Sequence, residues 1–366
     1  MTEITKKERI AVAMSGGVDS STVAAHLLEQ GHEVIGLTMQ LWDHGQPSAT
    51  SGGSRTCCAL DDVHDARRVA ETLGIPFYVV DKEQVFREQV VGGFMADYAA
   101  GLTPNPCIRC NQILKFEQLL TNATTLGCTA LATGHYAVIS SGSDGEPSLY
   151  RGADPAKDQS YFLFTLTRNQ MQRVLFPLGG LHKRETRAMA ERFGLHLAEK
   201  RESQDVCFVP DGDYGAFFQQ HGSGLVRPGP IVTRDGAVLG EHRGIVHYTI
   251  GQRRGLGVAV GEPLYVLEIR PEEETVVVGP EQGLFKQQLV LAEVNWLESE
   301  PIRVGRRLQA KIRYASAPEP AEITAHGHGE VTLRFDQPQR AVTPGQACVF
   351  YQGDRVLGGG WIQRRG

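Results

Sequence analysis

The sequence predicts an α/β fold, in which a parallel-sheet domain is followed by a small β-rich central domain and a C-terminal β-barrel. Two observations lead to this prediction. Strand-like and helix-like segments alternate over the first 200 residues, which is typical of a parallel sheet covered by helices. Beyond about residue 205 the apolar segments are short, alternate with polar residues and are separated by turn residues, as in antiparallel sheets and barrels. We therefore expect three domains, over residues 1–204, 205–281 and 282–366.

The first half begins with IAVAM at residues 10–14, a continuous apolar run that predicts a strand buried on both faces. Helical periodicity follows over residues 20–30 and ends at Gly31, a residue type that favours a helix terminus. The same reasoning predicts further strands at 33–39, 77–81 and 129–133, and further helices at 60–74, 83–99, 111–126 and 186–195.

In the second half, the predicted β segments are GIVHYTIGQ, LYVLEI, ETVVVG, LVLAEVNWL, RLQAKIRYA, AEITAHG, EVTLRF and ACVFYQGDRVLGGGWI. Residues 280–287, PEQGLFKQ, would link the two β domains. Residues 44–56 are small, polar and rich in Gly and Ser, which predicts a loop beside the C-terminal edge of the parallel sheet.

The composition is that of a globular protein, with 366 residues of which 41% are hydrophobic and 22% charged. The net charge of −5 argues against indiscriminate nucleic-acid binding. Residues 281–366, however, hold eleven Lys and Arg, nine of them Arg, against nine Asp and Glu. This excess of Arg favours a phosphate-bearing partner for that region, although a solvated surface of mixed charge would give a similar count.

The sequence predicts no membrane segment and a cytoplasmic location. Its first residues, MTEITKKERIAVAMSGG, show no apolar signal region or cleavage site. No apolar run approaches the roughly 20 residues that a membrane helix needs. Seven cysteines are too few for a secreted disulfide scaffold, and their odd number fits a reducing cytosol.

A glycine-rich stretch, AMSGGVDSS at residues 13–21, lies between the first predicted strand and the first predicted helix. Gly16 and Gly17 permit a sharp turn that exposes backbone N–H groups, and the following helix points its positive end at them. Such a turn at the end of a parallel strand predicts an anion site. Neither the Walker A pattern nor GxGxxG is present. Asp19 would repel a phosphate unless a cation lay between them, so we expect a role linked to Mg²⁺.

A CxxC pair, Cys107 and Cys110, stands in TPNPCIRCNQ at residues 103–112. From the residues alone it is compatible with half of a zinc site, half of an iron–sulfur site, a redox disulfide or a sulfur-transferring nucleophile. A zinc site would need a fourth ligand at the usual spacing, and we find none.

The segment SGGVDSS after an N-terminal strand resembles the pyrophosphate loop of the N-type ATP pyrophosphatases, whose fold is of the adenine nucleotide alpha hydrolase type. The resemblance implies an enzyme that cleaves ATP between the α and β phosphates and adenylates a carbonyl oxygen.

Further motifs resemble one family in that superfamily, the tRNA-specific 2-thiouridylases, from about residue 8 to the C-terminus and in the expected order. The motifs are TPNPCIRCNQILKF, TGHYA, KDQSYFL, SQDVCFV, HYTIGQRRGLG, KIRYAS and TPGQACVFY. The resemblance implies ATP-dependent 2-thiolation of the wobble uridine (position 34) of tRNA, through adenylation of the uracil C2 oxygen and transfer of sulfur from a cysteine persulfide. It also implies a sulfur donor protein, either a cysteine desulfurase or a sulfur carrier.

The resemblance assigns roles to individual residues. Cys110 would be the nucleophile and Cys207 would carry the persulfide, and the two can end the reaction as a disulfide. Residues implied to bind ATP are Ala13, Met14, Ser15, Gly16, Gly17, Val18, Asp19, Ser20, Met39 and Gly134. Residues implied to bind tRNA are Asn105, Pro106, Cys107, His135, Lys157, Asp158, Gln159, Arg313, Tyr314 and Gln346.

One position departs from the pattern of the family. An Asp usually stands where this chain has Cys107, so the role of that Asp as a general base does not carry over. Thiols at 107, 110 and 207 could instead bind three irons of a [4Fe–4S] cluster, which is the alternative to a disulfide relay. The remaining cysteines are interpreted as structural: Cys57 and Cys58 end the polar loop, and Cys128 and Cys348 lie in apolar, core-like contexts.

Two other functions are considered. One is a synthetase of the same superfamily that activates a small molecule, but the sequence has no evident glutaminase signature to supply ammonia. The other is a non-enzymatic RNA-binding protein with a structural metal at the CxxC pair. The glycine-rich loop argues against it, because such a protein would not need ATP.

Overall fold

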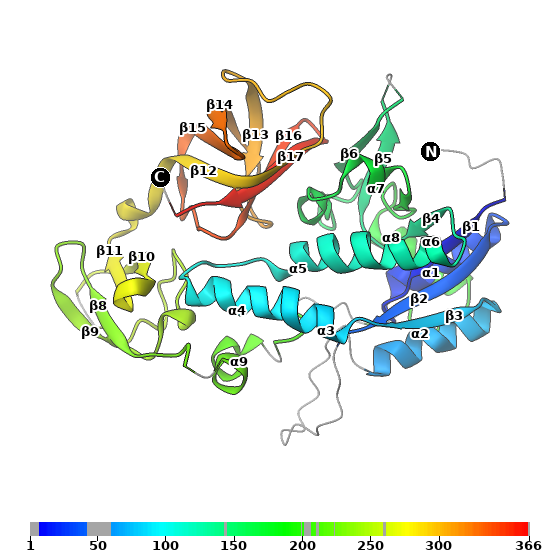
Figure 1. Cartoon of the computed structure of the whole chain (residues 1–366), viewed down its shortest axis with the longest axis horizontal. Coiled ribbons are helices and arrows are strands. Elements are labelled where there is room, and N and C mark those ends of the chain that lie inside the picture. Colours follow the sequence, from blue (N-terminus) through cyan, green and yellow to red (C-terminus); the bar gives the residue numbers. More distant parts are fainter. Residues whose placement is uncertain are drawn as a thin grey trace. The chain divides into compact units, whose positions relative to one another are not determined.

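The computed structural model describes residues 7–41, 60–142, 145–198, 200, 206–209, 212–222, 224–258 and 261–364. The predicted loop at 44–56 and the pair Cys57 and Cys58 lie outside these residues. The chain divides into two compact units (Figure 1). Unit 1 comprises Met1–Val90, Cys107–Asp211 and Asp354–Leu357; unit 2 comprises Val91–Pro106, Gly212–Gly353 and Gly358–Gly366.

A parallel sheet forms the centre of unit 1, with strand order β3-β2-β1-β4-β7. Its strands are β1 (Arg9–Ala13), β2 (Glu33–Gln40), β3 (Phe77–Asp81), β4 (Ala130–Ala132) and β7 (Val174–Leu175). Strand β1 is central, because its residue Val12 lies beside Gly36 of β2 and Ala132 of β4. This confirms the strands predicted at 10–14, 33–39, 77–81 and 129–133, whereas β7 was not predicted.

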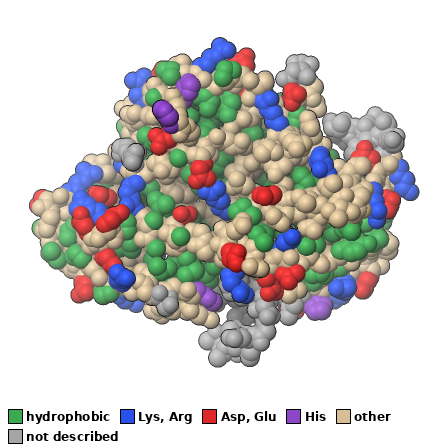
Figure 2. Space-filling view, in the orientation of Figure 1, with side chains coloured by type: hydrophobic (Ala, Val, Ile, Leu, Met, Phe, Trp, Pro, Cys, Tyr) green, Lys and Arg blue, Asp and Glu red, His purple; other side chains and the backbone are tan. Residues whose placement is uncertain are grey.

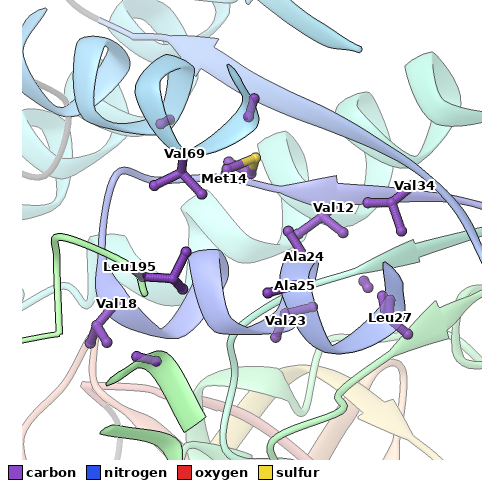
Figure 3. Packing of buried hydrophobic residues seen from close by; sticks show 14 of the residues in the cluster. Val12, Met14, Val18, Val23, Ala24, Ala25, Leu27, Val34, Val69 and Leu195 are labelled. Atoms are coloured by element: carbon purple, nitrogen blue, oxygen red, sulfur yellow. The ribbon is translucent and has the colours of Figure 1, made fainter. Parts of the chain in front are cut away.

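Helices α1 (Val18–Glu29), α2 (Leu60–Leu73) and α8 (Lys183–Arg192) accompany this sheet. Figure 3 shows the apolar side chains of α1, with Val23, Ala24 and Leu27 among them, packed with those of the sheet. Val12 of β1 and Val69 of α2 belong to the same buried cluster. Burial of this apolar face stabilises the arrangement and fixes where the loop between β1 and α1 lies.

The CxxC segment is helical in the structure. Helix α5 (Pro106–Arg109) runs directly into the π-helix η2 (Cys110–Leu119) and then α6 (Leu120–Thr125). The helix predicted from the sequence begins at residue 111, so both cysteines were expected to precede it. Proline is favoured in the first turn of a helix, because the N–H that it lacks has no partner there, and Pro106 begins this one.

Unit 1 contains further elements outside the parallel sheet. They include α3 (Glu83–Val85), the π-helix η1 (Phe86–Val91), the hairpin β5 (Ala137–Ser141) and β6 (Pro147–Arg151), η3 (Ser160–Leu163) and α7 (Arg168–Met171). The β5–β6 hairpin continues the sheet that contains β17 (Arg355–Ile362). Helix α4 (Gly92–Ala99) follows η1 directly in the chain and belongs to unit 2. Together α3, η1 and α4 confirm the helix predicted over 83–99.

Two β regions make up most of unit 2. The first is a sheet of order β10-β11-β8-β9, with β8 (Gly229–Val232), β9 (Val238–His242), β10 (Tyr265–Arg270) and β11 (Thr275–Gly279). The prediction of a strand in GIVHYTIGQ is wrong, because Ile245–His247 form the short 3-10 helix η5. Ile245 and Tyr248 instead bury their side chains in the core of this sheet. Helix α9 (Tyr214–His221) was not predicted.

The second β region is a closed barrel. Its strands run in the order β12-β15-β14-β13-β16-β17, and the additional pairing of β12 with β17 closes the ring. The bounds are β12 (Phe285–Trp296), β13 (Arg307–Lys311), β14 (Glu319–Gly327), β15 (Glu330–Arg340), β16 (Ala347–Gln352) and β17 (Arg355–Ile362). The parallel sheet, the second sheet and the barrel confirm the predicted fold class.

The visible surface carries mixed charge. Figure 2 shows Lys and Arg side chains interspersed with Asp and Glu over the face in view. Within the described ranges, no helix has the length and apolar character that crossing a membrane requires.

Candidate functional site

The turn between β1 and α1 has the geometry of an anion-binding loop. Gly16 has φ +67, and a Cβ built there would lie 2.2 Å from the backbone oxygen of Asp62, so no side chain fits. Gly17 is the N-cap of α1 and, having no side chain, cannot cap the first-turn N–H groups itself. The Ser20 hydroxyl accepts a hydrogen bond from Ser15 N at 3.2 Å and donates to Gly17 O at 3.2 Å, which holds the turn closed.

Asp19, in the first turn of α1, is paired with a lysine. The Lys183 ammonium donates to both carboxylate oxygens of Asp19, at 2.7 and 2.8 Å. The Tyr136 hydroxyl donates to Asp19 Oδ1 at 2.9 Å and lies 3.0 Å from the Thr186 hydroxyl. Thr186 and Lys183 are both on α8, so this helix supplies the cation that neutralises Asp19. From the sequence we expected a cation beside Asp19, but Lys183 was not identified.

A second lysine touches the loop itself. Lys200 Nζ donates to Gly16 O at 2.8 Å and to the carboxylates of Asp62 and Asp65, both at 2.6 Å. Burial acts to lower the pKa of Lys200, but the hydrogen bonds that it donates to Asp62 and Asp65 outweigh this effect and raise the pKa. Burial likewise acts to raise the pKa of Asp65, but its bonds with Lys200 and Arg68 lower it on balance. Lys200 therefore stays charged beside the loop.

The ends of the neighbouring strands approach the same loop. Gly134 follows β4, and a Cβ built on it would lie 2.9 Å from the Asp19 Cβ and 3.0 Å from Ser20 N. Only glycine allows β4 and α1 to come this close. Met39, near the end of β2, is partly buried and pairs with Val80 of β3. These positions lie at the carboxyl edge of the parallel strands, where open α/β sheets bind ligands.

His135 is buried rather than open to a macromolecule, with 9% of its surface exposed. Its Nδ1 lies 2.6 Å from the Thr133 hydroxyl and its Nε2 lies 3.5 Å from Lys115 Nζ. Since an ammonium can only donate, Nε2 accepts and Nδ1 carries the proton. Burial, with a smaller effect from Lys115, lowers the pKa of His135 well below its ordinary value, so the ring is neutral. The ring lies between Phe116 and Phe176.

Lys115 places the cysteine helix near the carboxyl edge of the parallel sheet. It is on η2, the helix that begins at Cys110, and its ammonium reaches His135 directly after Gly134. The same helix is held by Asn111, whose amide donates to Phe162 O at 3.2 Å. Cys110 is therefore on an element tied to the end of β4.

The segment that carries Cys207 lies against a neighbouring element. Val209 N donates to Val206 O at 3.0 Å, which forms a turn around the partly buried Cys207. Phe208 packs edge-on against Phe86, with ring centroids 5.6 Å apart. Lys82, four residues before Phe86, donates to Gln118 of η2 at 3.2 Å. The Cys207 turn and the Cys110 helix thus both contact the chain at 82–86.

Two other described cysteines are structural, as predicted. Cys128 is 4% exposed and Cys348 is fully buried. Burial raises the pKa of both thiols, with smaller effects from Arg9 and Glu33 at Cys128, so neither is prepared to react.

The loop at 157–159 is organised around the same site. Asp158 is 7% exposed and accepts hydrogen bonds from Gly152 N at 3.1 Å and Ser160 N at 3.0 Å. Gln159 exchanges two hydrogen bonds with the backbone of Tyr136, at 2.8 and 2.9 Å. Lys157 N donates to Asp154 O at 3.0 Å. Gln159 thereby supports Tyr136, which contacts Asp19.

The remaining expected tRNA contacts lie in unit 2. Gln346 Nε2 donates to Thr103 O at 2.8 Å, and Thr103 N donates to Pro344 O at 2.9 Å. The barrel turn at 343–346 therefore holds the chain that leads to Asn105 and Pro106. Arg313 donates to Arg340 O at 2.9 Å, and Tyr314 is 39% exposed with the Lys311 ammonium 5.3 Å from its ring centroid.

Cys107, Cys110 and Cys207 are the described thiols that the cluster alternative would use. Throughout the described ranges, which include Cys107, Cys110 and Cys207, no three His, Cys, Asp or Glu side chains come together in a way that would hold a metal ion. Asp19, with one carboxylate at the loop, fits a Mg²⁺ ion whose other ligands are phosphate oxygens.

Comparison with known protein families finds a match for each of three regions of the chain. Residues 8–211 match the profile described as tRNA methyl transferase HUP domain. Residues 216–280 match the tRNA methyl transferase PRC-barrel domain, and residues 286–362 match the aminomethyltransferase beta-barrel domain.

Curated relatives match the whole chain. The tRNA-specific 2-thiouridylase MnmA of Magnetococcus marinus is 58% identical over 98% of this chain and 100% of its own length. The proteins of the same name from Geobacter metallireducens and Geotalea uraniireducens are 54% and 51% identical, each over 99% of this chain and over 98% and 97% of their own lengths. Similarity of this extent covers every element of the candidate site.

Proposed function

The chain belongs to the tRNA-specific 2-thiouridylase family, and on that premise we propose that it is an ATP-dependent tRNA-uridine 2-sulfurtransferase. It converts the wobble uridine of tRNA, position 34, to 2-thiouridine. The observation that carries the proposal is the placement of a phosphate loop and the Cys110 helix at one edge of one parallel sheet. The name of a relative and a nucleotide site alone would not identify the residue that carries out the sulfur chemistry.

ATP binds at the loop between β1 and α1. The residues implied are Ala13 to Ser20 with Met39 and Gly134, and the α1 dipole favours the phosphates there. Lys183 and Lys200 add two positive charges, neither of which was expected from the sequence. Asp19 would hold Mg²⁺ together with the phosphates, and the ion would neutralise phosphate charge. Since Lys183 occupies both Asp19 oxygens here, it would turn to the phosphates when the ion binds.

Adenylation prepares the uracil for substitution. The C2 oxygen attacks the α-phosphate, pyrophosphate leaves into the loop, and the oxygen becomes part of AMP, a good leaving group. The target base must leave its stack to be reached. Asn105, Pro106 and Cys107 are proposed to frame it, because they begin the helix that carries Cys110.

Sulfur transfer then uses two thiols. The terminal sulfur of a Cys207 persulfide forms a bond to C2 while AMP departs with the oxygen. The Cys110 thiolate attacks Cys207 Sγ and breaks the S–S bond, so the sulfur stays on C2 and a Cys110–Cys207 disulfide forms. The transferred sulfur gains two electrons, and the two thiols supply them. A cysteine desulfurase or sulfur carrier loads Cys207 in the cytoplasm.

Contacts with tRNA are proposed on both units. Lys157, Asp158 and Gln159 would lie near the substrate through their link to Tyr136. Arg313, Tyr314 and Gln346 are proposed to act on the anticodon arm through phosphate, stacking and hydrogen-bond contacts. His135, which is buried and neutral, would act by positioning Lys115 rather than by touching RNA.

A methyl transferase activity, as the profile descriptions word it, would not require this site. Methyl transfer uses neither a pyrophosphate loop nor a persulfide, whereas the relatives that match the full length are named for thiolation. The test is pyrophosphate release from ATP with and without tRNA, with 2-thiouridine measured in the same reaction. The proposal predicts release that tRNA stimulates and that tracks 2-thiouridine. Release without tRNA and without thiolation would instead support a synthetase acting on a small molecule.

A further inference from the structure

Cys107 is the thiol that the proposed reaction leaves unused. It stands three residues before Cys110 on the continuous helix that begins at Pro106. Its side chain is exposed, whereas Cys110 and Cys207 are partly buried. Residues three apart lie on the same face of a helix, so Cys107 is the exposed neighbour of the Cys110 thiol.

The helix spacing permits a Cys107–Cys110 bond. Helical residues three apart have Cα atoms about 5 Å apart, within the range of roughly 4.4–6.8 Å that disulfides span. Their Cβ atoms, at about 5–6 Å, must approach by roughly an ångström. Cys107 is in the first helical turn, where the backbone N–H groups have no partner within the helix, so the turn can adjust without losing such a bond.

The two-thiol reaction leaves a practical problem. After each sulfur transfer Cys207 is locked to Cys110 in a disulfide, and both sulfurs are partly buried. Cys207 cannot accept new sulfur until that bond is broken. A reductant would have to reach a partly buried bond beside the tRNA site.

We propose that Cys107 is the resolving thiol of this enzyme, an inference that rests on the proposed function. The Cys107 thiolate attacks Cys110 Sγ, a Cys107–Cys110 disulfide forms, and Cys207 leaves as a thiolate. The exchange is electron-neutral: the proton lost by Cys107 goes to solvent, and Cys207 is ready to be loaded again. The disulfide is now at the surface, where a dithiol reductant of the thioredoxin class returns two electrons and two protons to the pair.

The test maps disulfides after one turnover. Enzyme carrying a persulfide on Cys207 is mixed with ATP and tRNA without reductant, quenched in acid, and alkylated before and after reduction. Peptide mass spectrometry then reports the state of each cysteine per 2-thiouridine formed. Cys128 and Cys348 serve as internal controls, because buried thiols react only after denaturation.

The expected result is a Cys107–Cys110 disulfide with Cys207 alkylated in the first step. In Cys107→Ser, whatever product forms is accompanied by a Cys110–Cys207 disulfide instead. A wild-type map that shows Cys110–Cys207 with Cys107 as a thiol overturns the inference, even if the variant is inactive. Iron in the anaerobically purified protein that is lost in Cys107→Ser also overturns it. Wild-type enzyme that makes no 2-thiouridine under these conditions contradicts the proposed function instead.

Discussion

The Lys183 ammonium lies 2.7 and 2.8 Å from the two carboxylate oxygens of Asp19, across the start of helix α1. Lys183 is 9% exposed and Asp19 is partly exposed, and the Tyr136 hydroxyl donates a further hydrogen bond to Asp19. When a pyrophosphate group binds with its cation, we expect Lys183 to exchange Asp19 for the phosphate as its partner. Asp19 would exchange Lys183 for the cation. We propose that the pair holds two charges that the nucleotide and its cation engage on binding.

Replacement of Lys183 tests this relationship. Lys183→Met leaves Asp19 without its cation beside the phosphates. We expect kcat/KM for tRNA-dependent pyrophosphate release to fall by about 10²-fold, the usual loss when a group that stabilises transition-state charge is removed. Steady-state kinetics with varied ATP measure the effect. The matched control is Arg184→Met, which changes an exposed neighbour on the same helix. Equal losses in the two variants would contradict a role for the Asp19 pair.

The two loop glycines differ in what they tolerate. Gly16 has φ +67 and a Cβ there would lie 2.2 Å from Asp62 O, whereas a Cβ on Gly17 would lie 3.6 Å from its nearest neighbour, Ser15 Oγ. Gly16→Ala should cost about 2 kcal/mol or more of stability from strain and displacement of the loop. Gly17→Ala should leave the nucleotide-free protein near wild-type stability. Thermal unfolding without ATP gives the comparison, and similar midpoints for both variants would argue against the loop geometry.

Stability should decrease below the ordinary pKa of histidine. The folded protein keeps His135 neutral because burial, and then Lys115, lower its pKa well below 6.5, while the unfolded chain takes up a proton near 6.5. The unfolded state thus binds more protons as pH falls, and unfolding becomes easier by about 1.4 kcal/mol per pH unit below 6.5 until His135 itself protonates. Above that pH this contribution is constant.

Urea unfolding of wild type and His135→Gln from pH 7.5 to 5 measures the difference. Burial also lowers the pKa of His26, His221, His242 and His247, so the wild-type slope includes their contributions. The difference between wild type and His135→Gln isolates the buried ring. Parallel pH profiles for the two proteins would contradict a neutral His135.

Separate measurements of tRNA affinity and of turnover show whether Gln346 positions the chain or contacts tRNA. Its amide donates to Thr103 O, so Gln346→Ala loosens the chain that begins the Cys110 helix. We expect 2-thiouridine formation at saturating tRNA to fall by about tenfold, while tRNA affinity changes by less than about threefold, since turnover depends on positioning. Filter binding and single-turnover thiolation measure the two quantities. Gln352→Ala, at an exposed position at the end of β16, is the control. The reverse pattern would indicate that Gln346 contacts tRNA directly.

Local sequence was sufficient for the fold class and for the loop between β1 and α1. The strand, the turn and the helix are predicted from about twenty consecutive residues, which hold IAVAM, SGGVDSS and the helical periodicity after them. This prediction depends on backbone preferences alone. Lys183 and Lys200 were missed because they reach the loop from 164 and 184 residues away. Nothing in HKRETR or AEK distinguishes a lysine that will bind Asp19 from one that will be solvated.

The helix around the CxxC pair was missed for a different reason. The helix was predicted to begin at residue 111, after both cysteines, although Pro106 is a favoured first residue of a helix and begins it in the structure. The burial of His135 and the hydrogen bond of Gln346 to Thr103 likewise depend on tertiary packing. The sequence could name these residues through family resemblance, but it could not state what they touch.

The most direct test follows labelled sulfur through one turnover. Enzyme with ³⁵S as the terminal persulfide sulfur on Cys207 is mixed with ATP and tRNA, and the label, AMP and pyrophosphate are counted together. The account predicts that label moves from Cys207 to tRNA as 2-thiouridine, with one AMP and one pyrophosphate for each sulfur transferred. Cys207→Ala that still thiolates tRNA with a protein sulfur donor, or label that reaches tRNA without AMP, would contradict it.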